Sequence, residues 1–276
     1  MDKHDDRTER SVAFALAVAL YLIWVAVTYL LEGRILTLQR PEAADARLAY
    51  ALVANVLVGI GGAALVVWVL SNMGVISPRQ AGFRRLGHAV PAVMVGAALG
   101  FVLYAVQGPP TFNPVVIANA YAQVLVVSIA EILVCWAVVG SASEVLLQDR
   151  RRGVAPVLAG IVSSVMFGAY HFAHSPPFNT VGFVVLLTVI GLVTSLFFLV
   201  SRDVYGTIAF HNFAGILGVT RALESSGTLA SFERPVIPIL VMAGVAVVLL
   251  IAAHVLLVSR TPARPSSRTR QADMVD

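Results

Sequence analysis

The residues that could carry chemistry gather in one part of the chain, about residues 131–215, where ionisable side chains interrupt apolar sequence. They are two glutamates, three histidines and an asparagine: Glu131, Glu144, His171, His174, His211 and Asn212. A carboxylate can take a proton from water, and a histidine or an amide can stabilise the oxyanion that forms when the water attacks a carbonyl group. Residues of these types could therefore carry out hydrolysis.

The histidines are spaced as they would be along helices. Phe167, His171 and His174 follow one another at intervals of four and three residues, which places them on one helix face. We expect Phe167 and His174 to form a substrate-binding wall there. His174 is equally consistent with an exposed loop, since Ser175 and two prolines follow it. For His211 the alternative is a hydrogen bond that only packs two helices together.

The two glutamates differ in their surroundings. Glu131 is enclosed by apolar residues on both sides, so it needs a polar partner, and the alternative to catalysis is a structural hydrogen bond across helices. Glu144 lies six residues before Arg150 and can instead be solvated or paired with the arginines at 150–152.

The composition describes the elements that must position these groups. Of the 276 residues, 58% are hydrophobic and 12% are charged, against about 25% charged in a soluble domain. A helix that crosses a bilayer needs about 20 apolar residues. We predict an all-α membrane bundle of about eight transmembrane helices, at residues 11–31, 48–70, 88–106, 115–140, 154–172, 181–200, 204–222 and 235–258.

The basic residues lie mainly in the loops that this arrangement places on one side. These are Lys3, Arg7, Arg10, Arg79, Arg84, Arg85, Arg150, Arg151, Arg152, Arg202, Arg260, Arg264, Arg268 and Arg270. The positive-inside rule then predicts a cell-membrane protein with both termini in the cytoplasm. Because the basic residues are spread over many loops, the net charge of +4 predicts no nucleic-acid partner. Cys135, the single cysteine, excludes an internal disulfide.

The chain divides into four parts by this interpretation. Residues 1–114 form accessory transmembrane helices, 115–222 a catalytic core, 223–260 the last transmembrane helix, and 261–276 a polar, disordered cytoplasmic tail.

Helical geometry ranks the two carboxylates. If helices four and five form a hairpin about residues 150–153, Glu131 and His171 are each roughly 20 residues from its centre and lie at similar depth. Glu144 would lie roughly 15–20 Å lower. We therefore expect Glu131 to approach His171. His211 would be about 10 Å shallower if helices five and seven start level, so the cluster needs a tilted or protruding hairpin.

Two segments carry a family resemblance. Residues 166–174 (MFGAYHFAH) and 205–212 (YGTIAFHN) resemble motifs two and three of the CAAX prenyl protease and bacteriocin-processing family of intramembrane proteases. Phe167 and His171 meet the FxxxH motif. His211 begins the HxxxN motif, but Gly215 stands where the asparagine is expected. The first motif, EExxxR, has only residues 143–148 (SEVLLQ) as its local match.

The resemblance implies an intramembrane endopeptidase that cleaves a membrane-bound peptide or a prenylated tail. It implies a glutamate as general base, His171 as its partner in proton transfer, and His211 with Asn212 at the oxyanion. We expect membrane lipid around the protein and no cofactor, with zinc held by His171, His174, His211 and Glu131 as the alternative. The departure in the first motif also fits an inactive member that binds membrane peptides. A transporter is a further alternative, although paired interrupted helices are lacking.

Overall fold

The helices of the protein form a bundle that confirms the predicted all-α fold. A computed structural model describes residues 3–34, 44–150 and 153–258, and no strand occurs among them. The helices are α1 (Lys3–Thr28), α2 (Ala44–Tyr50), α3 (Ala63–Asn72), α4 (Leu86–Val106), α5 (Pro114–Glu131), α6 (Ser141–Leu146), α7 (Val154–Tyr170), α8 (Val181–Ser201), α9 (Val204–Ser225) and α10 (Ile237–Val258). The predicted tail, 261–276, lies outside the described residues.

Several of these helices are joined without a break by shorter helical segments. Wider π-helical turns at Tyr29–Gly33 extend α1, those at Ala51–Gly62 join α2 to α3, and those at Ile132–Gly140 join α5 to α6. Short 3₁₀ turns follow α7 at His171–Ala173 and precede α10 at Leu229–Phe232. The fourth predicted span, 115–140, is thus longer than expected and reaches Leu146.

Seven long helical stretches in the described chain are apolar enough to cross a membrane. They are Arg7–Gly33, Ala46–Asn72, Leu86–Val106, Pro114–Leu146, Val154–Ala173, Val181–Ser201 and Ile237–Val258. The remaining long helix, α9, has 22 residues and is less apolar because it carries His211, Asn212 and Arg221. Its length suffices for an eighth crossing, since about 20 residues span the hydrocarbon core.

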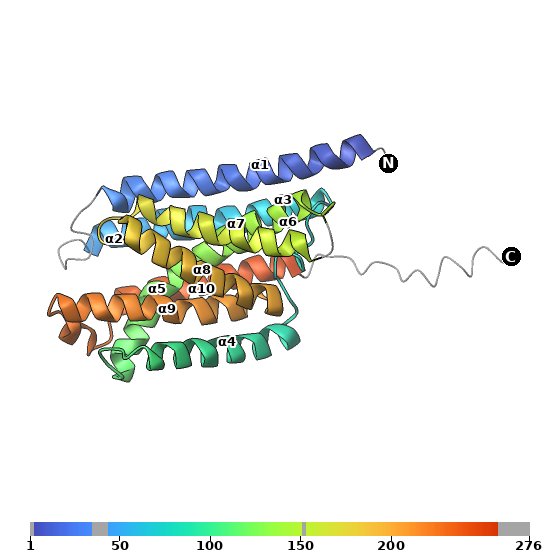
Figure 1. The fold of residues 1–276 in the computed structure, drawn as a ribbon. Helices are drawn as coiled ribbons and strands as arrows, with labels where there is room; N and C mark the ends of the chain where they lie inside the picture. Colours follow the sequence, from blue (N-terminus) through green and yellow to red (C-terminus); the bar gives the residue numbers. More distant parts are fainter. Residues whose placement is uncertain (1–2, 35–43, 151–152, 259–276) are drawn as a thin grey trace.

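The stretch Pro114–Leu146 forms the centre of the bundle. Its apolar window is 83% buried, whereas the other six stretches are 22–50% buried. All nine residues of its π-helical part, Ile132–Gly140, are buried. A helix that is apolar all round is stable where protein surrounds it, so the other helices enclose this one. In Figure 1, α5 passes obliquely between its neighbours.

Small residues allow the helices around the site to approach closely. A Cβ at Gly168 of α7 would overlap the Thr188 side chain of α8, and Gly191 of α8 lies against Ser164 and Phe167 of α7. Close backbone approach through small residues is typical of membrane helix pairs. The hairpin of α7 and α8 is therefore tight where it carries His171. Figure 1 also shows that α1 begins and α10 ends at the same end of the bundle, as an even number of crossings requires.

Candidate functional site

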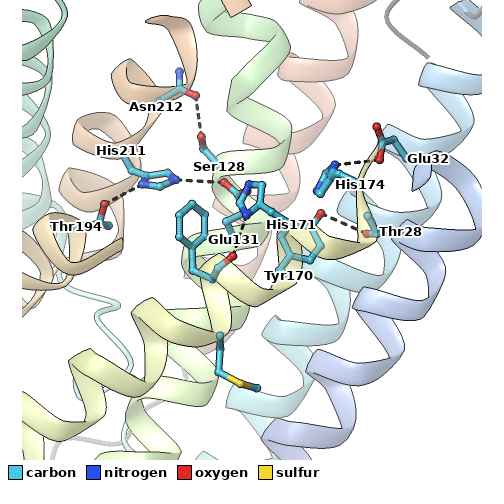
Figure 2. Close-up of polar contacts among 12 residues, drawn as sticks. Thr28, Glu32, Ser128, Glu131, Tyr170, His171, His174, Thr194, His211 and Asn212 are labelled. Carbon is cyan, nitrogen blue, oxygen red and sulfur yellow. Dashed lines mark hydrogen bonds and ion pairs between the residues drawn. The ribbon is translucent and has the colours of Figure 1, made fainter. Parts of the chain in front are cut away.

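Glu131 is the centre of a buried polar cluster (Figure 2). Its side chain lies where α5 changes to π-helical turns, in the most enclosed part of the bundle, and Glu131 is 5% exposed. Its Oε2 is 3.2 Å from Nε2 of His211, and its Oε1 is 3.6 Å from Nε2 of His171. The predicted approach of Glu131 to these two histidines is confirmed. Short π-helical insertions are frequent at functional sites because they rotate side chains relative to a regular helix.

The position of α9 explains how His211 reaches this depth. Arg202, just before α9, binds Glu144 through both guanidinium nitrogens, at 2.6 and 3.1 Å. The start of α9 therefore lies within the length of an arginine side chain from Glu144 in α6, and the turn between α6 and α7 extends beyond it. The hairpin formed by the stretch Pro114–Leu146 and α7 therefore extends past the start of α9. The depths counted from the sequence required a tilted or protruding hairpin of this kind. His211, only a short way into α9, thus lies beside Glu131.

Hydrogen bonds on the far side of each imidazole determine which nitrogen faces Glu131. Nδ1 of His171 is 2.9 Å from the carbonyl oxygen of Phe167, which can only accept, so this Nδ1 carries a proton. Nδ1 of His211 is 2.9 Å from the hydroxyl of Thr194, and that hydroxyl donates to the carbonyl of Ile190 at 3.0 Å. Nδ1 of His211 is consequently the donor to Thr194.

In its neutral form, each imidazole therefore directs an Nε2 lone pair at the same carboxyl group. The contact of 3.2 Å between His211 and Glu131 then requires one proton, held by either partner. The cluster is a set of three basic groups that share a proton. Such a set can take a proton from a water molecule bound beside it.

Phe167 packs between the two histidines. Its ring lies 4.8 Å from that of His171, 5.0 Å from that of His211 and 5.4 Å from that of Trp136, measured between centroids. Phe167 is 2% exposed. The structure thus places this predicted wall residue beneath the imidazoles, where it limits their rotation. Trp136 is held in turn by a hydrogen bond from its Nε1 to Ser195 at 2.8 Å.

Asn212 is buried beside His211 but bonds to α5. Its Oδ1 accepts from Ser128 at 3.0 Å, and its Nδ2 donates to the carbonyl of Tyr121 at 3.1 Å. Among the described residues, neither amide atom of Asn212 contacts Glu131. Gly215, the position where the family motif has asparagine, lies so close to Val124 of α5 that a Cβ there would overlap it. The departure in the third motif therefore coincides with close packing of α5 and α9.

Glu144 does not join the cluster. It is 13 residues beyond Glu131 along the same helical stretch, which corresponds to roughly 15–20 Å. Its predicted partners were the arginines at 150–152, of which Arg151 and Arg152 lie outside the described residues. The observed partner is Arg202 instead, because the start of α9 lies at this level.

His174 belongs to a second buried cluster, so its interpretation as an exposed loop residue is wrong. It is 9% exposed, and its Nδ1 is 3.1 Å from Oε2 of Glu32, at the end of the helix begun by α1. Ser175 donates to Glu32 through its backbone nitrogen at 2.8 Å and through its hydroxyl at 2.6 Å. Gly33 permits this contact, since a Cβ there would overlap the carbonyl oxygen of Ala173.

Glu32 is the residue that sequence reasoning missed. The first predicted span, 11–31, ended one residue before it. The sequence feature that could have indicated this residue is a single acidic residue directly after the apolar residues Leu30 and Leu31. The phenol of Tyr170 bonds Tyr50 at 3.1 Å and Thr28 at 3.3 Å, which ties α7 to the N-terminal helices beside this cluster (Figure 2).

The four residues proposed as zinc ligands are divided between the two carboxylates. His171 and His211 face Glu131, whereas His174 turns its Nδ1 to Glu32. In the described part of the chain, no group of three or more His, Cys, Asp or Glu side chains is arranged to hold a metal ion. Cys135 is buried and unbonded to another cysteine, in agreement with the sequence.

A comparison with protein families matches residues 141–217 to the family described as Type II CAAX prenyl endopeptidase Rce1-like. The matched segment includes Phe167, His171 and His211, so the family resemblance is confirmed over these residues. Glu131 lies ten residues before the segment begins. Searches of curated proteins and of solved structures found no match.

Proposed function

We propose, from the match of residues 141–217 to the type II CAAX prenyl endopeptidases, that this chain is an intramembrane endopeptidase acting on a membrane-associated peptide. The observation that carries the proposal is the Glu131 carboxyl group held between Nε2 of His171 and Nε2 of His211. The matched family segment supplies both histidines, and the fold supplies the carboxylate.

Glu131 is the general base in this proposal. When the shared proton is on His211, Glu131 is a carboxylate, and its Oε1 faces the Nε2 lone pair of His171 across 3.6 Å. A water molecule that donates one O–H to each of these acceptors becomes nucleophilic at its oxygen. As the oxygen attacks the carbonyl carbon, Glu131 takes the proton and the carbonyl π electrons move to the carbonyl oxygen.

His211 stabilises the oxyanion that results. Its Nε2–H, present while Glu131 is ionised, donates to the developing negative charge in a site that excludes bulk water. Thr194 fixes the ring by accepting from Nδ1. Asn212, which the resemblance assigns to the same role, is proposed here to hold α9 against α5 through Ser128 and Tyr121.

The substrate class follows from the surroundings of the site. Apolar helices enclose it, so a substrate must arrive from the lipid or lie at the membrane surface. We propose a lipid-anchored or membrane-bound peptide, with no nucleic-acid partner and no metal ion in the reaction. We further propose that both termini are cytoplasmic, which reporter fusions at the two ends would test by reporting the same side.

An inactive, peptide-binding protein is the second candidate. The observation that favours it is the departure in the first motif, where Ser143 and Gln148 stand in place of a glutamate and an arginine. Such a protein would bind the same peptides without cleaving them.

The test is cleavage of a farnesylated peptide by the purified protein in phospholipid vesicles, with products identified by mass spectrometry. Hydrolysis in ¹⁸O-labelled water should place the label in the new carboxyl group. Binding without any cleavage would support the inactive alternative. Metal analysis of the same sample should find less than one bound zinc ion per chain.

A further inference from the structure

The second buried carboxylate, Glu32, is surrounded by hydrogen-bond donors, whereas Glu131 lies between two imidazole nitrogens that can accept a proton. Three donors converge on it: the Ser175 backbone N–H, the Ser175 hydroxyl and Nδ1 of His174. Glu32 is 4% exposed. A backbone N–H can only donate, and a carboxyl group that accepts from several donors is favoured in its ionised form. Glu32 is therefore a buried anion, whereas Glu131 shares a single proton with the imidazole nitrogens that face it.

His174 is the basic side chain in contact with this anion. A buried carboxylate without a counter-charge is costly, and the imidazolium form of His174 would supply that charge. In that form Nδ1–H donates to Glu32 and Nε2 carries a second proton. Nε2 of His174 is buried, and no described group accepts a hydrogen bond from it. In the imidazolium form the ring is therefore an acid with one unused donor.

The ring that carries this unused donor stacks on His171, one of the two histidines at the proposed reaction centre. The rings of His174 and His171 are stacked, with centroids 5.1 Å apart and an interplanar angle of 24°. Figure 2 shows the order of the side chains across the site, from His211 through Glu131 and His171 to His174 and Glu32. A peptide bond attacked at Glu131 would therefore have an acid on the far side of His171.

We propose that His174 is the general acid that protonates the departing amide nitrogen, and that Glu32 is the positioning residue that keeps it charged. This inference rests on the proposed peptidase function. When the tetrahedral intermediate collapses, the C–N bond breaks and its electron pair remains on nitrogen, which takes the proton from Nε2 of His174. The carbonyl bond reforms from the oxyanion. The proton that Glu131 took from water then restores His174.

The leaving group provides the test. An amide nitrogen cannot leave without a proton, whereas an ester oxygen is a much better leaving group and depends less on an acid. The probes are a farnesylated peptide and the matched depsipeptide, in which an ester replaces the scissile amide. Both are measured in phospholipid vesicles with wild type, Glu32→Gln and His174→Gln. Glu233→Gln, an exposed glutamate, is the control for the substitution itself.

We expect Glu32→Gln and His174→Gln to lower kcat for the amide by about 10²-fold or more, and kcat for the ester by less than about 3-fold. Glu131→Gln should abolish both reactions, and Glu233→Gln should change neither. Ser175→Ala removes the hydroxyl donor to Glu32 but keeps the backbone N–H and His174, so its loss should be smaller than that of Glu32→Gln and again larger for the amide than for the ester. If Glu32→Gln does not fold, His174→Gln carries the test alone, because the bonds between Ser175 and Glu32 remain.

Equal losses on both probes would assign Glu32 and His174 a purely structural role and overturn the inference, as would unchanged amide cleavage. These results would leave the peptidase function intact, provided that Glu131→Gln is inactive. If wild type cleaves neither probe, the proposed function itself fails, and the inference fails with it.

Discussion

Glu131 and Glu144 lie on the same continuous helical stretch and have very different surroundings. Glu144 binds a guanidinium group that supplies two N–H donors, and about a fifth of each side chain remains exposed. Glu131 is buried, and its nearest polar atoms are the Nε2 atoms of two imidazoles whose Nδ1 protons are already engaged. A carboxylate that already accepts hydrogen bonds from N–H donors forms an ion pair. A carboxylate that lies beside other proton acceptors can instead take up a proton, and burial alone does not distinguish the two cases.

Replacing the histidines should give the largest effect on the Glu131 side of this comparison. We expect His171→Ala and His211→Ala each to lower kcat by about 10²–10⁴-fold, because each removes a group that contacts the reacting atoms. Peptide cleavage in vesicles measures this, and thermal unfolding verifies that the variants are folded. Full activity per folded molecule, together with a large loss of stability, would assign both histidines to packing.

Thr194→Val should give a smaller effect at the same place. Valine has nearly the same shape but cannot accept from Nδ1 of His211, so the ring loses the contact that fixes its orientation. Loss of a partner that orients a metal-bound histidine costs about 10–100-fold, and we expect an effect of similar size for this metal-free histidine. The decrease should be in kcat, with KM nearly unchanged. A change in KM alone would indicate that Thr194 acts on substrate binding.

On the Glu144 side, Arg202→Gln should affect stability and leave the chemistry unchanged. The pair is partly exposed, so its disruption should cost about 1–3 kcal/mol of unfolding free energy, between the values for surface and buried pairs. Unfolding in detergent and cleavage per folded molecule provide the two measurements. A variant that is stable but inactive would place Glu144 in the reaction.

Gly215→Asn restores the residue expected by the family motif and tests whether packing excludes it. We expect a destabilisation of about 1–3 kcal/mol, because the new side chain overlaps Val124 of α5. Val124→Ala should recover part of that loss in the double variant. If Gly215→Asn is stable and raises activity, the motif asparagine fits and Asn212 does not substitute for it.

The sequence alone predicted the main elements and the central contact. Long apolar runs are determined by the thickness of the bilayer, so the helices and the meeting of Glu131 with His171 followed from counting residues. Other features depended on how helices pack. The depth of His211 is set by the contact between Arg202 and Glu144, and the direction of Asn212 by the rotation of α9.

Glu32 could not be assigned for a related reason. Its partners His174 and Ser175 are about 140 residues away in sequence, and no local pattern links the end of α1 to the turn after α7. The contact depends on Gly33, which allows the two backbones to meet. A lone acid at the end of an apolar run is also common at membrane surfaces, so its burial became evident only in the folded bundle.

The most direct test of Glu131 as the general base is cleavage of the farnesylated peptide by Glu131→Gln and by Glu144→Gln, compared in the same vesicles. Both substitutions preserve side-chain shape and remove one negative charge from the same helical stretch. We expect no detectable cleavage by Glu131→Gln and near wild-type cleavage per folded molecule by Glu144→Gln. Retained cleavage by folded Glu131→Gln, or its loss in folded Glu144→Gln alone, would contradict the assignment of Glu131 as the base.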